Sequence, residues 1–484
     1  MKAGKLVLTL ALLLAAAALG AYAYVLQIQH GEVVTGLRSV GAGGAVWGLS
    51  VVMDGCFLGP GVAVMAAACL ARFSRDRAME AVARIAMPSA IACFLGAALS
   101  VMADQGRPLA ALANLSLYAR PQSPMFVTFT AVGAICLFGS LLHCVLARRP
   151  DLAEYAKRPS AWQGLQRLFA AGYRGTPGQR YRRRKAGFWM SLFMLPALVA
   201  PATALAILFV VRPSRGVDGV LLETAAFLLT SFASGIALLV VAATLVEKLA
   251  GRDAGVGGRG YARLGRWLLF AVALSLSAIV AAEIASVGSR DAAVSAYGRA
   301  LLVEYGDMFW VAIGSLFVAA AVLWRALRRW RGRAGPLLVA SLMVEGAVFA
   351  HHYWLLVGWQ THGLALPYEP GVYSPTWIEF AVVLGIVAVC ILLLLPAVRL
   401  IPFAPLAVDL RRMKKVRDVR RAVLTSVWIL LGLVVSAIGL ASSARVGTHP
   451  AMDPLIAGSP VIFIVGLVML ATTAALYELL PERD

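Results

Sequence analysis

The sequence predicts an all-α, polytopic transmembrane bundle of about twelve helices with both termini in the cytoplasm. Two observations predict this fold class. Of the 484 residues, 61% are hydrophobic and only 14% are charged, whereas a soluble globular chain is about half apolar and about a quarter charged. The apolar residues also gather in repeated runs of roughly 20 residues, the length of a helix that crosses the hydrocarbon core. The loops between the runs leave no room for a separate soluble domain.

Twelve apolar runs are long enough to span a bilayer. They begin near Leu6, Trp47, Ile85, Met125, Phe188, Val220, Trp267, Tyr305, Leu337, Thr376, Ala422 and Pro454. We expect residues 1–44 to form the first helix and an outer loop, residues 45–399 a transmembrane core, and residues 400–484 a basic loop and two final helices. The first run also resembles a secretory signal peptide, with Ala21-Tyr22-Ala23 as a candidate cleavage site.

Lys and Arg residues alternate between dense and sparse loops, which predicts the orientation. If the N-terminus faces the cytoplasm, 36 of the 44 basic residues lie in cytoplasmic segments and 8 in outer loops. This bias is the positive-inside rule of a prokaryotic inner-membrane protein. It also accounts for the net charge of +20, so we expect contact with anionic lipid and no nucleic-acid partner. The densest tract, Arg148–Lys185, anchors the orientation or else forms a docking surface for a cytoplasmic partner.

Cysteine and histidine usage argues against a metal, haem or iron–sulfur centre in this chain. All six cysteines lie in apolar runs and none forms a CxxC pair, as zinc and iron–sulfur sites usually require. A b-type haem subunit is an alternative, but haem ligation usually needs histidines from facing helices. Within the predicted spans there are only His143 and the adjacent pair His351 and His352.

Ionisable side chains inside predicted spans are candidates for function, because a charge in hydrocarbon is costly. Asp54 lies roughly 10 Å below the outer end of its span at 1.5 Å per residue. Glu345 lies seven residues before His352, which places both on nearly one helix face. The set gathers mostly in the outer half of the membrane and comprises Asp54, Glu223, Glu283, Asp307, Glu345, His351, His352 and Glu379. As an alternative, these groups are satisfied pairs that fix helix packing.

Three motifs resemble the NrfD/HybB/PsrC family, the quinone-handling membrane subunits of respiratory oxidoreductase complexes. They are Trp47-Gly48-Leu49 leading to Asp54, Gly59 and Gly61; Asp104-Gln105-Gly106-Arg107-Pro108 followed by Ser123-Pro124-Met125; and Tyr373-Ser374-Pro375-Thr376 followed by Glu379 and Gly385. The motifs occur in the family's order and cover about residues 47–399. The longer, HybB-like branch is the more similar one.

The resemblance implies a menaquinone-type ring bound near the outer, periplasmic face. Electrons would pass to or from an iron–sulfur subunit docked outside, with a multihaem cytochrome or molybdopterin subunit beyond it. This chain would then be a subunit of a quinone-linked oxidoreductase without a redox centre of its own. The quinone-binding candidates are Trp47, Asp54, Asp104, Arg107, Tyr373 and Glu379.

Proton exchange with a quinone needs a carboxylate and an imidazole, whose pKa values burial can bring near neutrality. We expect Asp54 to exchange protons, with His351 or His352 as a hydrogen-bond partner of the ring. Arg107 could neutralise Asp54 or Asp104. A proton path to either face could use Glu223, Glu283, Asp307 and Glu345.

One departure from the family weakens the quinone prediction. Longer members carry a histidine on the fifth helix, where this chain reads Leu198-Val199-Ala200-Pro201-Ala202-Thr203-Ala204-Leu205. Either His351 or His352 replaces it, or the chain is a structural membrane anchor without quinone turnover. A proton-coupled transporter is a further alternative, because embedded carboxylates are typical of that class, although the inverted repeats common there are not evident.

Overall fold

The computed structural model describes residues 3–38, 44–71, 73, 77–106, 108–113, 132–157, 159, 162–211, 217–249, 256–303, 305–329, 334–361 and 371–400. Several predicted features lie outside these residues. They are Arg107, the Ser123-Pro124-Met125 motif, the start of the fourth span near Met125, and the two final spans beginning near Ala422 and Pro454.

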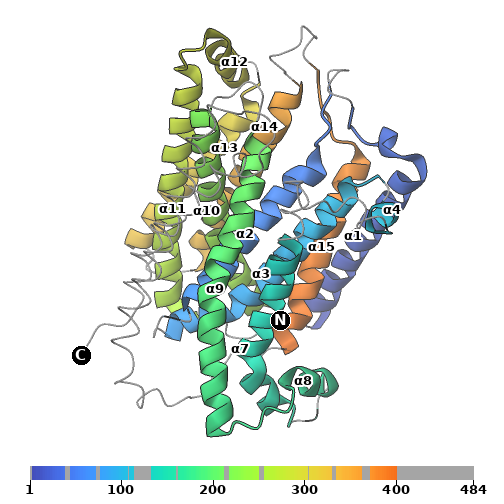
Figure 1. The fold of residues 1–484 in the computed structure, drawn as a ribbon, viewed down its shortest axis with the longest axis vertical. Coiled ribbons are helices and arrows are strands. Elements are labelled where there is room, and N and C mark those ends of the chain that lie inside the picture. Colours follow the sequence, from blue (N-terminus) through green and yellow to red (C-terminus); the bar gives the residue numbers. More distant parts are fainter. Residues whose placement is uncertain are drawn as a thin grey trace, which may run out of the picture.

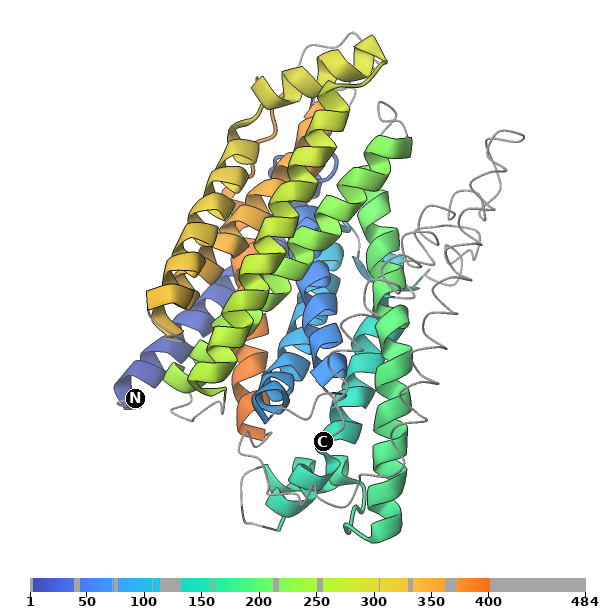
Figure 2. The same ribbon diagram turned by 90° about the vertical axis from the view of Figure 1, so that its left-hand side faces the viewer.

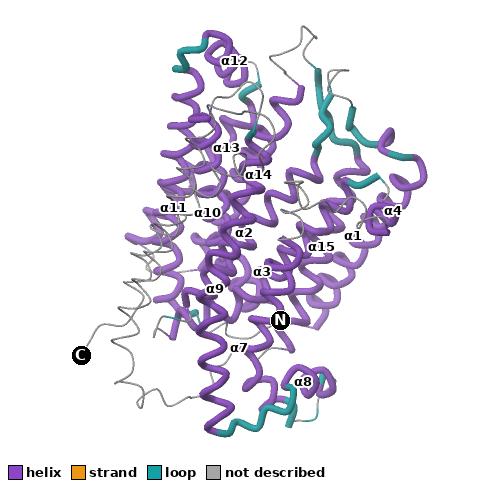
Figure 3. Tube along the Cα trace, viewed as in Figure 1, coloured by secondary structure: helices purple, strands orange, loops and turns teal. Residues whose placement is uncertain are grey.

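In the part of the chain that the structure describes, every regular element is a helix (Figure 3). The elements are α1 (Ala3–His30), η1 (Glu32–Val34), α2 (Leu49–Ala71), α3 (Arg77–Asp104), α4 (Pro108–Ala113), η3 (Val132–Gly139), α7 (Ser140–Tyr155), α8 (Gln163–Ala170), α9 (Pro177–Val210), α10 (Val217–Leu249), α11 (Gly257–Val287), α12 (Ala292–Val303), α13 (Asp307–Arg329), α14 (Ala334–Thr361) and α15 (Trp377–Leu400). Nine of these described helices are long and apolar enough to cross a membrane. They confirm the all-α, multi-pass prediction.

The helix starts differ from the predicted span starts where a helix continues beyond its apolar part. The fifth predicted span begins near Phe188, yet α9 begins eleven residues earlier, at Pro177. Thr176 caps this start by accepting a hydrogen bond from the Gln179 N–H at 3.3 Å, and proline suits the first helical position. Hydropathy detects only the part of a helix that lies in lipid, so the basic turns of α9 resemble a loop in the sequence.

Long helices that follow one another in the chain run in opposite directions within one bundle (Figures 1 and 2). Helix α2 packs against α3 and α10, α14 packs against α13 and α10, and α15 packs against α1 and α3. The loops before α2, α13 and α15 share one end of the bundle, and α8 lies at the other end with the start of α9. We name the latter the basic end, for the exposed Lys157, Arg167, Arg174, Arg180, Arg182 and Lys185.

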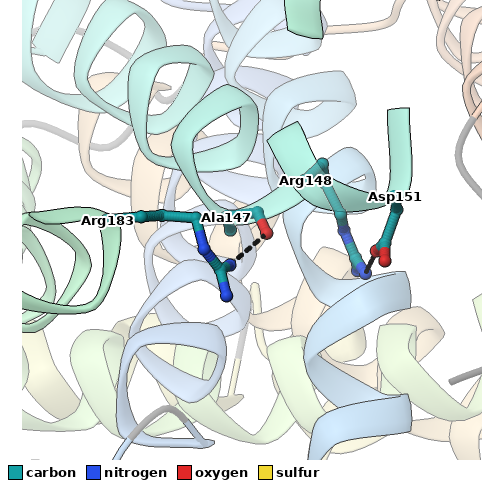
Figure 4. Close-up of polar contacts among 4 residues, drawn as sticks. All are labelled: Ala147, Arg148, Asp151 and Arg183. Atoms are coloured by element: carbon teal, nitrogen blue, oxygen red, sulfur yellow. Dashed lines mark hydrogen bonds and ion pairs between the residues drawn. The ribbon is translucent and has the colours of Figure 1, made fainter. Parts of the chain in front are cut away.

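Arginine side chains tie the helices together at the basic end (Figure 4). Arg183 of α9 donates a hydrogen bond to the Ala147 carbonyl of α7 at 3.3 Å. Arg148 is buried and lies 3.4 Å from the Asp151 carboxylate. Arg149 donates to the Ala170 and Ala171 carbonyls at 3.3 and 3.0 Å, which holds the C-terminus of α8. Part of the basic tract therefore supports the fold rather than facing solvent.

Two glycines let the backbones of α1 and α15 touch. A Cβ atom added at Gly20 would lie 2.6 Å from the Gly385 Cα and 2.8 Å from the Ala381 carbonyl oxygen. A Cβ atom at Gly385 would lie 2.8 Å from the Gly20 Cα. Small residues are common where membrane helices approach closely, because packing rather than hydrophobic burial holds them together. The candidate cleavage sequence Ala21-Tyr22-Ala23 directly follows this contact inside α1, and Ala23 is fully buried.

We predict that Gly20→Ala destabilises the protein by about 1–3 kcal/mol, the usual range for overpacking. Thermal unfolding in detergent, followed by tryptophan fluorescence, measures the effect. Gly346→Ala is the matched control, because a Cβ atom there meets nothing within 4 Å. Equal melting temperatures for the two variants would contradict the close contact between α1 and α15.

Candidate functional site

Helices α10 and α14 make two side-chain contacts that lie seven residues, or two turns, apart on each helix. The His352 ring of α14 stacks on Phe227 of α10, with the ring centroids 4.2 Å apart and 10° between the planes. Seven residues further along α10, the Ser234 hydroxyl donates a hydrogen bond to the Glu345 carboxylate of α14 at 2.5 Å. Glu345 and His352 therefore both face α10, as their seven-residue spacing predicts.

His352 is the histidine that turns toward α2. Its Nδ1 lies 3.5 Å from the Cys56 Sγ, and a Cβ atom at Gly55 would lie 3.4 Å from the same nitrogen. The side chain is fully buried, and its Nε2 has no hydrogen-bond partner among the described residues. A buried polar atom of this kind needs a partner, because leaving it unmatched costs about 1–3 kcal/mol. The imidazole is therefore contacted at Nδ1 and unmatched at Nε2 within the described part of the chain.

His351 has different surroundings, although it is equally buried. Its ring lies 6.3 Å from the ring of Trp354, which in turn lies 5.0 Å from the ring of Phe309 in α13. The two adjacent histidines therefore serve different faces of α14. His352 contacts Cys56 of α2, the helix that carries Asp54.

Asp54 is buried in α2, immediately before Gly55 and Cys56. Its charge interacts with that of Asp104 at the end of α3, and the charge of Asp104 interacts with those of Glu32 and Glu379. We name this set of four carboxyl groups, Glu32, Asp54, Asp104 and Glu379, the acidic end. The second predicted motif thus comes close to the first.

Burial raises the pKa of Glu32, and the nearby Glu379 carboxylate adds to this effect. A hydrogen bond from Gln27, at 3.0 Å to each Glu32 oxygen, opposes it. The same Gln27 amide donates to the Ala103 carbonyl at 3.0 Å and so joins α1 to the end of α3. Glu32 and Gln27 therefore help to hold the acidic end together, although the sequence pattern did not single them out.

Glu379 and Tyr373 form a junction between three segments. The Glu379 carboxylate accepts hydrogen bonds from the Gly36 N–H at 2.7 Å, the Thr376 N–H at 2.9 Å and the Tyr373 hydroxyl. The Tyr373 oxygen in turn accepts a hydrogen bond from the Leu49 N–H at 2.8 Å, at the first residue of α2. These contacts use the polar atoms of both side chains, so in the structure Tyr373 and Glu379 support the N-terminus of α2. Their predicted contact with quinone stays a prediction.

Gln360 is a further junction, which the sequence pattern does not reveal. Its side-chain oxygen accepts hydrogen bonds from the Val46 and Trp47 N–H groups at 2.9 and 2.8 Å. Its amide nitrogen donates to the Trp47 carbonyl at 3.0 Å. Trp47 is thereby fixed against α14, with its ring 6.1 Å from Phe209 and 6.4 Å from Trp359. A neutral amide at a helix end belongs to no recognisable sequence motif, so only the fold shows its role.

The other predicted residues lie apart from this group. Glu223 of α10 and Glu283 of α11 are buried, 1% and 6% exposed, and Asp307 is exposed in the first turn of α13. Among the described residues, no group of three His, Cys, Asp or Glu side chains could hold a metal ion. The candidate site therefore consists of His352, Cys56 and Asp54, with Glu345 two helical turns away from His352 along α14.

Comparison with known proteins gives the same assignment as the motifs. Residues 39–362 match the protein family described as "Polysulphide reductase, NrfD". The chain belongs to the NrfD family. The matched region contains the α2 and α3 motifs, Cys56 and His352, and it ends before Tyr373 and Glu379.

The NrfD-family chain is also similar to a protein of Halobacterium salinarum that is described as a putative membrane subunit of a dimethyl sulfoxide reductase. The two are 27% identical over 412 residues, which cover 81% of this chain and 89% of the relative. The similarity thus extends over most of both chains and agrees with a multi-pass membrane protein.

We predict that Glu379→Ala lowers the melting temperature of the purified protein. The change leaves the N–H groups of Gly36 and Thr376 without their acceptor, at about 1–3 kcal/mol for each group. Glu379→Gln keeps one acceptor oxygen, so its melting temperature should lie between those of the wild type and Glu379→Ala. Glu80→Ala removes an exposed carboxylate and serves as the control. If Glu379→Ala has the same melting temperature as this control, Glu379 does not support the junction.

Glu32 also predicts how stability changes with pH. Its folded-state pKa is raised, so its stabilising effect is complete below the unfolded pKa of about 4.3 and is lost as pH rises through the folded value. Glu32→Gln should match the wild type near pH 4 and become the more stable protein near pH 8. Melting temperatures across this range test the sign, and a wild type that gains stability over Glu32→Gln with rising pH would contradict it.

Proposed function

We propose that this chain is the membrane subunit of a respiratory oxidoreductase complex and binds menaquinone near the acidic end of its bundle. Membership of the NrfD family supports the broad role, and the relative described as a reductase membrane subunit agrees with it. The observation that carries the quinone site is the buried His352 Nε2, which lacks a partner in the described part of the chain. A quinone ring oxygen is a suitable acceptor or donor for an imidazole nitrogen.

Each residue of the site has a distinct task. A bound quinone would supply two-electron, two-proton redox chemistry. His352 would hold a hydrogen bond at Nε2, and Phe227 keeps its ring in place by stacking. Asp54, buried on α2, would carry the proton that the ligand gains or loses. Trp47, fixed by Gln360, is joined to Phe227 through the ring of Phe209 and would cover the site on the side of the acidic end.

Proton movement toward the basic end would use the contact between α10 and α14. Glu345 and Ser234 lie two turns deeper than His352 and Phe227. The second Glu345 oxygen has no hydrogen-bond partner among the described residues. These polar groups support a route into the membrane. Glu223, Glu283 and Asp307 would belong to the outer exit.

Electrons would come from, or go to, an iron–sulfur subunit docked at the acidic end, with further redox subunits beyond it. The positive-inside rule places the basic end in the cytoplasm, in contact with anionic lipid, and the acidic end in the periplasm. The docked subunit is proposed from the resemblance to the family, and the orientation from the distribution of Lys and Arg.

A structural anchor without quinone turnover is the second candidate. It is favoured by α9, where the run Leu198–Leu205, which contains Thr203, stands in place of the family's histidine. The Thr203 hydroxyl donates to the Val199 carbonyl of its own helix at 2.9 Å. This contact leaves the hydroxyl proton of Thr203 engaged within α9, so the site would depend on His352.

We predict that Asp54→Asn lowers quinol-dependent turnover of the assembled complex by about 100-fold or more, the usual contribution of a proton-transferring group. Turnover is followed with a soluble quinol analogue, and bound quinone is extracted from the same preparation. Asp291→Asn is the control, because Asp291 is exposed before α12 and asparagine preserves its capping contact with Ala293.

The two measurements together separate the candidates. Bound quinone in the wild type and lost turnover in Asp54→Asn support the site. A preparation without quinone, with normal turnover in Asp54→Asn, identifies the chain as a structural anchor.

A further inference from the structure

We propose that the Cys56 thiol is a positioning residue that holds His352 in the tautomer with its proton on Nε2. The inference rests on the proposed quinone site and deepens it. It assigns a role to a cysteine that packing alone would otherwise explain. It also says which chemical form of the ligand the site would prefer.

The geometry around the imidazole leaves one polar contact for Nδ1. Cys56 Sγ lies 3.5 Å from this nitrogen, within the range of a hydrogen bond that involves sulfur. The face of the ring is covered by Phe227 at 4.2 Å. A Cβ atom at Gly55 would already be 3.4 Å from Nδ1, so a larger residue there would crowd the contact. Within the described residues, Cys56 is thus the hydrogen-bond partner of His352.

The direction of this hydrogen bond follows from the two groups. A thiol is a weak donor and a weaker acceptor, whereas the bare nitrogen of a neutral imidazole is a good acceptor. In an apolar, buried setting both groups stay neutral, because burial disfavours the charged form of each. The thiol proton therefore points to Nδ1, and the ring proton resides on Nε2. The hydrogen bond made by one ring nitrogen commonly decides the state of the other in this way.

A proton on Nε2 makes the open edge of His352 a hydrogen-bond donor. A donor there matches the carbonyl oxygen of an oxidised quinone ring better than the hydroxyl of the reduced ring. Cys56 would therefore favour binding of the oxidised ligand without touching it.

Nitrogen NMR on protein labelled with ¹⁵N-histidine and stripped of quinone reports the tautomer directly. The His352 signals are identified by their loss in His352→Gln. In the wild type we expect Nε2 to be protonated and Nδ1 to be bare. Cys56→Ala should mix the two tautomers, and Cys56→Ser, which keeps a donor of similar size, should restore the wild-type pattern.

Kinetics give the second measurement. Cys56→Ala should raise KM for an oxidised quinone analogue by about three- to tenfold, the loss expected for one misplaced hydrogen bond, with a smaller change in kcat. Cys56→Ser should rescue KM. A purely structural cysteine would lower stability in both variants without this split.

The outcomes separate this inference from the proposed function. A wild-type His352 protonated on Nδ1, or a tautomer unchanged in Cys56→Ala, overturns the role of Cys56 while the quinone site stands. An absence of bound quinone together with normal turnover in Asp54→Asn overturns the site, and the tautomer measurement in quinone-free protein still reports on Cys56. The predicted tautomer pattern with the KM rescue by serine supports the inference.

Discussion

The fold depends on one constraint: within lipid, each polar group must find its partner in the protein, because no water is present to satisfy it. Helices meet this requirement for the backbone. Side chains meet it by pairing across helices, as Ser234 does with Glu345 and Gln360 with Trp47. By the same constraint, a buried polar atom without a partner calls for a physical explanation. His352 Nε2 is costly to bury alone, and for that reason we propose it as the atom that binds a ligand.

The junction of Glu379 and Tyr373 shows how contacts between distant segments can support a neighbouring site. Glu379 and Tyr373 join the loop after η1, the start of α2 and the start of α15. They hold Leu49, the first residue of α2, which is the helix that carries Cys56. Gln360 holds Trp47 from the end of α14. The geometry at His352 therefore depends on contacts made by segments that are far apart in the chain.

The spans could be predicted because hydrophobic runs and basic loops are properties of local sequence. Nine predicted spans begin within or near described helices of the structure; the start of the fourth span and the last two spans lie outside the described residues. The site could be predicted only in part. Asp54 and the histidine pair stood out as ionisable residues in apolar runs, but helix rotation decides which histidine meets α2. Cys56 and Gln360 carry no charge, so neither burial cost nor pattern marks them before the helices are packed. Glu379 resembled a ligand-binding carboxylate, whereas its backbone partners are visible only in three dimensions.

The contact between Gly20 and Gly385 has a consequence for how the protein is made. It joins the first described helix to the last one, so α1 enters the membrane long before its partner exists. Most of its surface is exposed in the finished bundle, which suits a helix that must persist alone in lipid. Of the described helices α15 is made last, and it brings Glu379 to the loop after η1. Among the described segments the support of α2 is therefore the last to form, and a chain truncated before α15 would keep its earlier helices in the membrane without the contact between Glu379 and Gly36.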